Sequence, residues 1–166
     1  MAIPKEDLYV SRVLGFGEIP EHNPIENIRS FAAEESGIYF GRAVMSGTLA
    51  ETQVKIFSGA SGKFKGVALK STEASNLDDS HYDDHDSVAV IDQGIVNVYS
   101  EETIALGDSV RIRHTTSGAK VKGSFCKTAV AGETAVLSGA EWRAAGASGT
   151  AVKLYLDPPF TITADT

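Results

Sequence analysis

Cysteine is almost absent from this 166-residue chain, which contains only Cys126. A single cysteine cannot close a disulfide within the chain, so we expect a small core or surface residue in a reducing compartment. Long apolar runs are also missing. The longest, residues 88–91, is far too short to span a bilayer. The opening MAIPKEDLYV lacks the apolar stretch of a secretory signal. We therefore expect neither a membrane partner nor export by such a signal.

Residue patterns that catalyse reactions are missing as well. The Gly-rich stretches at residues 15–17 and 59–62 lack the Lys-Ser/Thr pair and helix of a phosphate-binding loop, so we expect turns there. The four histidines lack the spacing of a cupin metal site. No nucleophile has a base placed beside it in the sequence. The sequence therefore predicts no catalytic residue, no cofactor and no enzymatic activity.

One segment, DDSHYDDHD at residues 78–86, resembles a metal-binding cluster. Its aspartates suit calcium, and His81 with His85 would suit a transition metal if both lay on one helical face. The spacing is not that of an EF-hand loop, and strand patterns rather than a helical period flank the segment. We expect an exposed acidic loop without a metal. A metal-dependent β-barrel enzyme is the least favoured alternative.

Charge of one sign dominates, with a formal net charge of −7. An acidic chain is a poor ligand for nucleic acid, so no such partner is predicted. The signs are separated along the chain: residues 71–110 hold ten acids and no Lys or Arg, whereas residues 111–127 hold five bases and no acid. The two blocks either complement each other between neighbouring copies or form two solvated surfaces.

What is present is a β pattern. A high glycine content, an ordinary hydrophobic fraction and no long helical period favour an all-β domain. We predict a small β-sandwich or open barrel of about seven to ten short strands. We predict a hairpin turn at Asp92-Gln93-Gly94 and the end of a strand at Pro158-Pro159. Within residues 110–114 the arginines alternate with apolar residues, so we expect both arginines on the outer face of a strand. Residues 138–145 can form either a capped helix or a strand that carries Trp142 into the core, and the strand is favoured because Gly146 and Gly149 interrupt the segment too soon for a stable helix. The other strands are predicted at residues 38–45, 53–57, 64–69, 88–91, 95–99, 110–114 and 152–157, with residues 160–163 as a candidate last edge strand.

Residues 1–37 differ from the remainder, residues 38–166. Prolines and glycines interrupt any period, and only Asn23-Pro24-Ile25-Glu26 has the pattern of a helix start. We predict an extended N-terminal arm followed by a β-rich domain. The arm is too apolar to remain free in water, so it lies on its own domain or on a neighbour. We expect it to make contacts with other proteins or subunits, with these residues as anchors: Leu8, Val10, Val13, Leu14, Phe16 and Ile19.

Several short motifs of this sequence follow the order found in one known protein family. An ordered set of short motifs within residues 35–156 resembles the structural cement, or head decoration, proteins of tailed phages. The motifs are Phe40-Gly41-Arg42-Ala43-Val44, FKGVAL at 64–69, Tyr82, DSVAV at 86–90, GIVNV at 94–98, LGDSV at 106–110 and AVKL at 151–154.

The resemblance implies a virion protein without catalytic residues. It would bind the major capsid protein on the outer surface of the assembled head, stabilise the shell and be assembled in the host cytoplasm. It also implies self-association, with a homotrimer expected. A tail, adaptor or host-glycan-binding component of the virion is the alternative.

Overall fold

A computed structural model describes residues 15–20, 25–71, 74 and 80–166 of the chain. Within them there are β-strands and no helix, which confirms the all-β prediction. No described segment forms a helix that could cross a bilayer. The strands are β1 (Asn27–Ala33), β2 (Ile38–Tyr39), β3 (Ala43–Ser46), β4 (Gln53–Ile56), β5 (Phe64–Ala68), β6 (His81–Tyr82), β7 (Ser87–Tyr99), β8 (Arg111–Arg113), β9 (Phe125–Cys126), β10 (Thr134–Trp142) and β11 (Ala151–Ala164).

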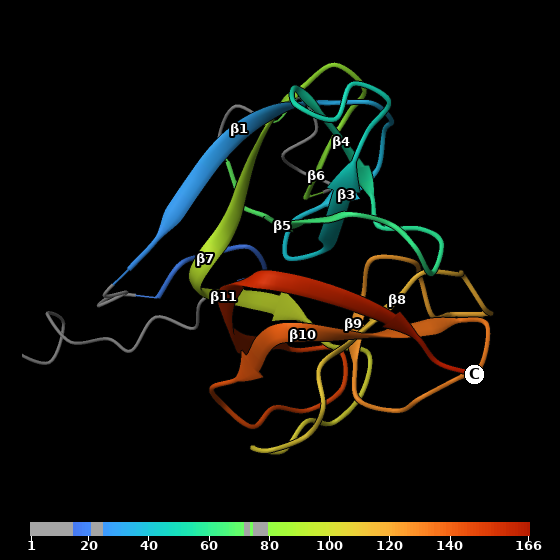
Figure 1. Ribbon diagram of the computed structural model, residues 1–166. Helices are drawn as coiled ribbons and strands as arrows, with labels where there is room; N and C mark the ends of the chain where they lie inside the picture. Colours follow the sequence, from blue (N-terminus) through green and yellow to red (C-terminus); the bar gives the residue numbers. More distant parts are fainter. Residues whose placement is uncertain (1–14, 21–24, 72–73, 75–79) are drawn as a thin grey trace, which may run out of the picture.

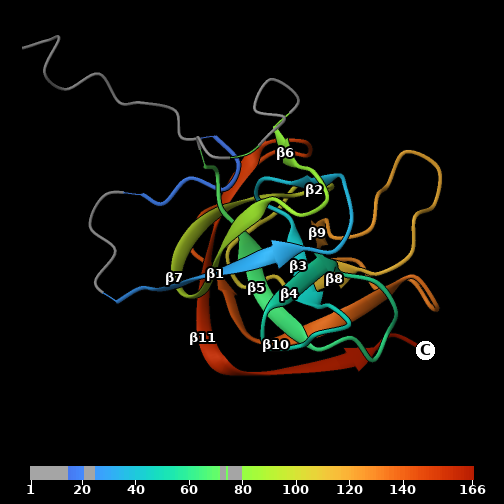
Figure 2. The ribbon, with the colours of Figure 1, turned by 90° about the horizontal axis from the view of Figure 1, so that it is seen from above.

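Nine of the described strands form two barrel-like rings that share β7, and β2 and β6 pair with each other in a separate small sheet (Figures 1 and 2). In the first ring, β1 pairs with both β4 and β7, and β3 and β5 complete the path between them. In the second ring, β7 pairs with β11, followed by β10, β8 and β9. A bridge between Phe125 and Ser100 then returns to the end of β7. β7 therefore joins the two halves of the fold as one strand.

Each ring encloses apolar side chains. Phe31, Val44 and Val88 belong to a cluster inside the first ring. A larger cluster fills the second ring and includes Trp142, whose ring meets Phe125 edge-on at 6.4 Å between centroids. Trp142 lies in β10 and is almost fully buried, as predicted. Alternation of apolar residues along these strands therefore places one face of each strand in a core.

The hairpin predicted at Asp92-Gln93-Gly94 is wrong, because β7 passes straight through these residues. The first half of β7 pairs with β1 and β5, and the second half pairs with β11. Asp92 accepts hydrogen bonds from Asn27 Nδ2, at 2.7 Å, and from Arg29 Nη2. Each half finds a partner elsewhere in the chain, so these nonlocal pairings replace the local hairpin.

The strand end predicted at Pro158-Pro159 is also wrong. β11 continues to Ala164 and pairs with β10 on both sides of the prolines. The ladder resumes after a register shift, with Ala140 opposite Leu156 and Ser138 opposite Thr161. Gly139, at φ +86°, occupies the shift, where a Cβ atom would lie 2.8 Å from the carbonyl oxygens of Asp157 and Pro159. A bulge therefore accommodates the prolines within the strand.

The range predicted as an arm contributes a strand to the fold. β1 lies within residues 1–37, and its Phe31 and Ala33 are buried. Of the segment expected to start a helix, residues 23 and 24 lie outside the described residues, while 25 and 26 lead directly into β1. The division into an arm and a domain stays a prediction.

Candidate functional site

The predicted contact residues fall into two groups. Leu8, Val10, Val13 and Leu14 lie outside the described residues. The other two, Phe16 and Ile19, are half-buried against their own domain, Ile19 on the larger core and Phe16 on the core of the first ring. Their role in contacts with other proteins stays a prediction.

Backbone hydrogen bonds hold residues 15–20 beside the second half of β7. The amide of Gly17 donates to the carbonyl of Asn97 at 2.7 Å, and the amide of Asn97 donates to the carbonyl of Glu18 at 3.0 Å. Lys70 closes the segment from the other side, because its amide donates to Gly17 and its Nζ lies 3.1 Å from a carboxylate oxygen of Glu18. Residues 15–20 therefore have a defined position beside the second half of β7.

Several aromatic side chains lie beside residues 15–20. The ring of Phe16 meets Tyr99 edge-on at 5.3 Å between centroids. The guanidinium of Arg42 lies 4.0 Å from the ring centre of Tyr99 and 6.0 Å from that of Tyr39. Tyr39 is 44% exposed and stacks on His81. We call Phe16, Tyr39, Arg42 and Tyr99 the Arg42 patch. Tyrosine and arginine are the residue types most enriched in protein–protein contacts.

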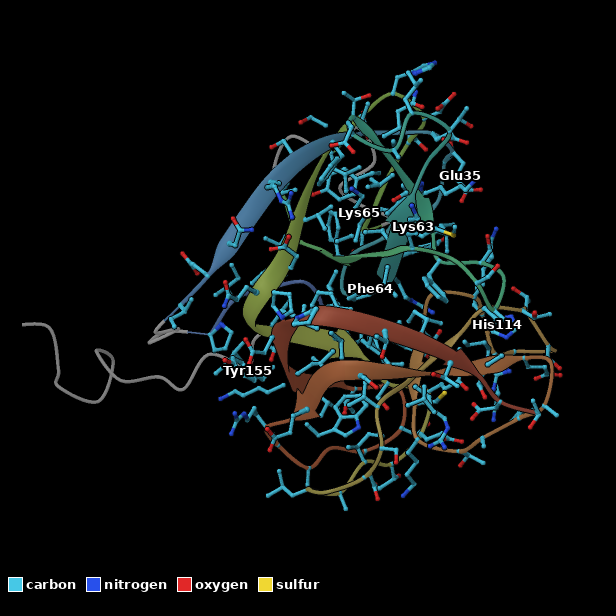
Figure 3. All side chains as sticks on the ribbon, in the orientation of Figure 1. Glu35, Lys63, Phe64, Lys65, His114 and Tyr155 are labelled. Atoms are coloured by element: carbon cyan, nitrogen blue, oxygen red, sulfur yellow. The ribbon has the colours of Figure 1, made fainter. Side chains whose placement is uncertain are left out.

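A shallow groove lies where β1, β5 and β11 approach one another. Its volume is about 340 Å³, and Phe64, Phe160 and Pro158 supply its apolar lining. Phe64 and Phe160 meet edge-on at 5.0 Å between centroids. Lys63 and Lys65, on either side of Phe64, also line the groove (Figure 3). Glu51 and Asp92 line it as well, so the groove combines aromatic rings with charged side chains of both signs.

Single apolar side chains are exposed elsewhere on the described surface. They come from the start of β1, from the turn before β4, and from the loops before β8 and β9. The larger ones, besides Tyr39, are Ile25, Ile28, Leu49, Leu106 and Val121. The sequence did not single them out, because an isolated apolar residue in a strand or turn looks the same whether it faces the core or water.

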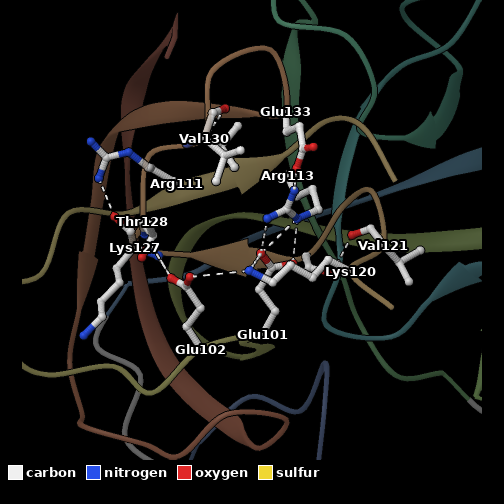
Figure 4. A network of polar contacts seen from close by, with 12 residues as sticks. Glu101, Glu102, Arg111, Arg113, Lys120, Val121, Lys127, Thr128, Val130 and Glu133 are labelled. Carbon is white, nitrogen blue, oxygen red and sulfur yellow. Dashed lines mark hydrogen bonds and ion pairs between the residues drawn. The ribbon is translucent and has the colours of Figure 1, made fainter. Parts of the chain in front are cut away.

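The acidic and basic blocks meet within the chain (Figure 4). Arg113 is 1% exposed and contacts Glu101, which is 3% exposed, at 2.7 Å, and Glu133 at 2.5 Å. Lys120 lies 3.8 Å from Glu102, and Lys127 lies 3.2 Å from Asp108. Complementarity between the blocks is thus made inside one molecule. Neither alternative raised from the sequence included these pairs inside one chain, and complementarity between neighbouring copies stays a prediction.

The arginines of β8 do not form a solvent-facing surface, contrary to prediction. Arg111 and Arg113 do flank the buried Ile112, but Asp165 covers Arg111 at 3.2 Å, and Glu101 covers Arg113. The hydrogen bonds that Arg113 donates to the Glu101 carboxylate raise the pKa of Arg113, and burial acts in the opposite direction. The guanidinium therefore remains charged inside the fold.

Two neighbours of this cluster have shifted pKa values. Burial acts to raise the pKa of Glu102, but the amides of Lys127 and Thr128 donate to its carboxylate at 2.9 Å and lower the pKa overall. Burial, together with the charges of Glu101 and Glu102, raises the pKa of the Cys126 thiol to about 12. A buried thiol with this pKa is not a nucleophile at neutral pH.

The described part of the acidic loop separates its two histidines. His81 lies 3.3 Å from Asp83, whereas His85 is largely exposed and lies 3.4 Å from Asp84. Asp78 and Asp79 fall outside the described residues. Within the described part of the chain, no three His, Cys, Asp or Glu residues gather closely enough to hold a metal ion.

Comparisons with known proteins identify the class and then the family. A chain in the solved structure "The capsid of Myoviridae Phage XM1" has the same fold, with a TM-score of 0.69 at 18% identity, over 95% of this chain and 98% of that chain. No curated protein matches. The model of the structural cement protein family (E217 gp24/Pam3 gp6) matches residues 14–157. The class is thus an all-β phage structural protein, and the chain belongs to the structural cement protein family. It is a capsid decoration protein and a component of the virion.

Proposed function

We propose that this cement protein binds the major capsid protein on the outer surface of the assembled head and stabilises the shell without catalysing a reaction. The family match over residues 14–157 carries this proposal. A protein that binds the assembled lattice more tightly than the free subunits shifts the equilibrium toward the lattice by mass action. Many identical weak contacts, repeated by symmetry, then make the attachment strong.

The surface chemistry supports binding rather than catalysis. The Arg42 patch and the groove at Phe64 are open surfaces that combine aromatic and basic side chains, which are typical of protein contacts. The described cysteine is buried and has a raised pKa. A protein that works through contacts alone needs a rigid scaffold, and the two rings with their buried ion pairs provide one.

We propose that residues 1–37 act as the arm and residues 38–166 as the docking domain, with β1 fastening the arm to the domain. In this proposal Leu8, Val10, Val13 and Leu14 contact the capsid or a neighbouring copy. Phe16 and Ile19 anchor the base of the arm to their own domain and extend the contact surface. We further propose a homotrimer on the capsid, as the resemblance to the family implies.

The direct test mixes the purified chain with undecorated capsids of its own phage and measures the bound fraction by sedimentation. We expect saturable, stoichiometric binding, and a higher temperature for capsid disruption after binding. An antibody against the chain should label intact heads, because the protein lies on the outer surface. Absence of binding would contradict the proposed function.

A truncation then tests the arm. Residues 15–20 are hydrogen-bonded to β7 and to Lys70, so the deletion is confined to residues 1–14. We expect at least about a tenfold loss of affinity, as for removal of a few apolar anchors, with no change in the unfolding midpoint. Unchanged affinity would remove the arm from the contact. Trimer formation is measured separately, by the number of copies at each bound site in images of decorated capsids.

A further inference from the structure

Arg42 differs from the other arginines of the described residues in lacking a carboxylate partner. The other four each lie within ion-pair distance of an acid: Arg29 at Asp92, Arg111 at Asp165, Arg113 at Glu101 and Glu133, and Arg143 at Glu141. Glu101 is the carboxylate whose charge acts most on Arg42, but it forms its ion pair with Arg113. Arg42 therefore carries a positive charge that the described fold does not neutralise.

The surroundings of Arg42 hold the guanidinium in place and remove part of its water. Its plane lies near the rings of Tyr99 and Tyr39, and Nη1 donates to the hydroxyl of Ser124. Ser124 is itself buried and donates to the carbonyl of Val121 at 2.6 Å. Burial lowers the pKa of Arg42, because the charged form has lost hydration without gaining a counter-ion.

The remaining N–H groups of Arg42 are accessible. Among the described residues, only Ser46 Oγ and His114 Nε2 are buried side-chain polar atoms without a hydrogen-bond partner. No described residue accepts a hydrogen bond from the other nitrogens of Arg42, so these nitrogens keep some exposure to solvent. A guanidinium that lies over the ring of Tyr99 and has N–H groups without a described acceptor matches the planar two-oxygen geometry of a carboxylate.

We propose that Arg42 is a carboxylate-binding site for an Asp or Glu side chain of the capsid lattice, with Tyr39, Tyr99 and Phe16 packing around the bound group. This inference rests on the proposed function and adds the chemistry of one contact to it. Docking would exclude water from a charge that is already partly dehydrated. The new ion pair would therefore cost less desolvation than one formed between two fully hydrated groups.

The capsid is a better source of the carboxylate than a second copy of this chain. The chain has a net charge of −7, so two free copies repel each other at long range. The patch also includes Phe16, at the point where the predicted contact arm joins the domain. A contact through the arm would therefore bring the capsid surface next to Arg42.

The test compares Arg42→Gln with Arg143→Gln in binding to undecorated capsids. Arg143 is a matched control, because it also lies over a tyrosine ring, Tyr155 at 4.7 Å, but it already has Glu141 as a partner. We expect Arg42→Gln to weaken binding at least about tenfold, the scale of a lost charged hydrogen bond, and to flatten its salt dependence. Arg143→Gln should bind like the natural chain.

Stability measurements separate a contact role from a structural one. Arg42→Gln should keep an unfolding midpoint close to that of the natural chain. If it does not, Arg42→Lys and Tyr39→Ser provide the test, since Tyr39 is exposed and lysine keeps the charge without the paired N–H geometry. A folded variant that binds capsids as tightly as the natural chain overturns the inference.

The remaining outcomes are also decisive. If the natural chain binds and only the Arg42 variants lose affinity, the inference is supported. If the natural chain itself fails to bind, the proposed function is rejected and the inference with it. If Arg42→Gln changes the sedimentation of the free protein instead, the carboxylate comes from a second copy and the capsid assignment is wrong.

Discussion

The ion pair between Glu101 and Arg113 gives the sharpest test of how this fold is held together. Both side chains are almost fully buried, and Glu101 accepts from Nε at 2.9 Å and from Nη2 at 2.7 Å of Arg113. In Glu101→Gln the shape is kept, but the charge is lost and an NH2 group replaces an acceptor. Among the described carboxylates, Glu133, which is 30% exposed, then remains as the partner of the buried guanidinium.

The expected loss follows from this arrangement. Removing one partner of a buried ion pair costs about 3–5 kcal/mol, because the other charge stays buried without compensation. For a chain of this size, that loss lowers the thermal midpoint by roughly 6–20 °C. The matched control is Glu141→Gln, which removes an exposed pair with Arg143 and should cost less than about 1 kcal/mol.

Urea unfolding of the natural chain and both variants measures these differences directly. The unfolding slope should stay constant, so that the change in midpoint reports stability. A third variant, Glu101→Leu with Arg113→Met, replaces the pair with apolar side chains and should recover most of the loss. If Glu101→Gln costs no more than Glu141→Gln, the buried pair contributes no net stability and the reasoning is refuted.

Four further predictions concern single sites. The pKa of Glu102 is lower in the folded chain than its unfolded value of 4.5, so the ionised carboxylate stabilises the fold above pH 4.5 and this contribution is lost as the pH falls through the folded pKa. In Glu102→Gln the acid-induced drop in unfolding midpoint should therefore be smaller than in the natural chain. Gly66→Ala should lower the free energy of unfolding far more than Gly107→Ala, as measured by chemical denaturation. Both residues have positive φ, but a Cβ at Gly66 would lie 2.2 Å from the Ile91 carbonyl oxygen, whereas Gly107 faces open space. Cys126, with its pKa of about 12, should resist alkylation in the native protein at neutral pH and react after unfolding; rapid native labelling would contradict its burial. Trp142→Ala should cost about 3–5 kcal/mol in the same assay, and a loss below about 1 kcal/mol would show that the second core repacks.

Local patterns in the sequence identified much of the β structure. Residues 53–57 and 64–69 were predicted as strands and contain β4 and β5. The strand reading of residues 138–145 placed Trp142 correctly, because the glycines that follow prevent a stable helix. Such features depend on neighbouring residues, so they can be read along the chain.

The candidate contact surface was only partly visible in the sequence. Phe16 was singled out because the arm is apolar, but Tyr39 and Arg42 come from the β2–β3 region and Tyr99 from the end of β7. Their meeting depends on how the first ring joins the end of β7. Nor does sequence spacing reveal which arginine lacks an acid, since the partners of the others lie between 2 and 63 residues away.

The sequence alone determined that this protein is a strand-and-turn chain with alternating apolar residues, because alternation and turn residues act over a few positions. Only the tertiary structure decided that residues 87–99 form one strand shared by two rings, since its partners are supplied by distant segments. It also decided which charges are neutralised. An ion pair depends on distance in space, so the acidic and basic blocks paired with each other while Arg42 was left open at the surface.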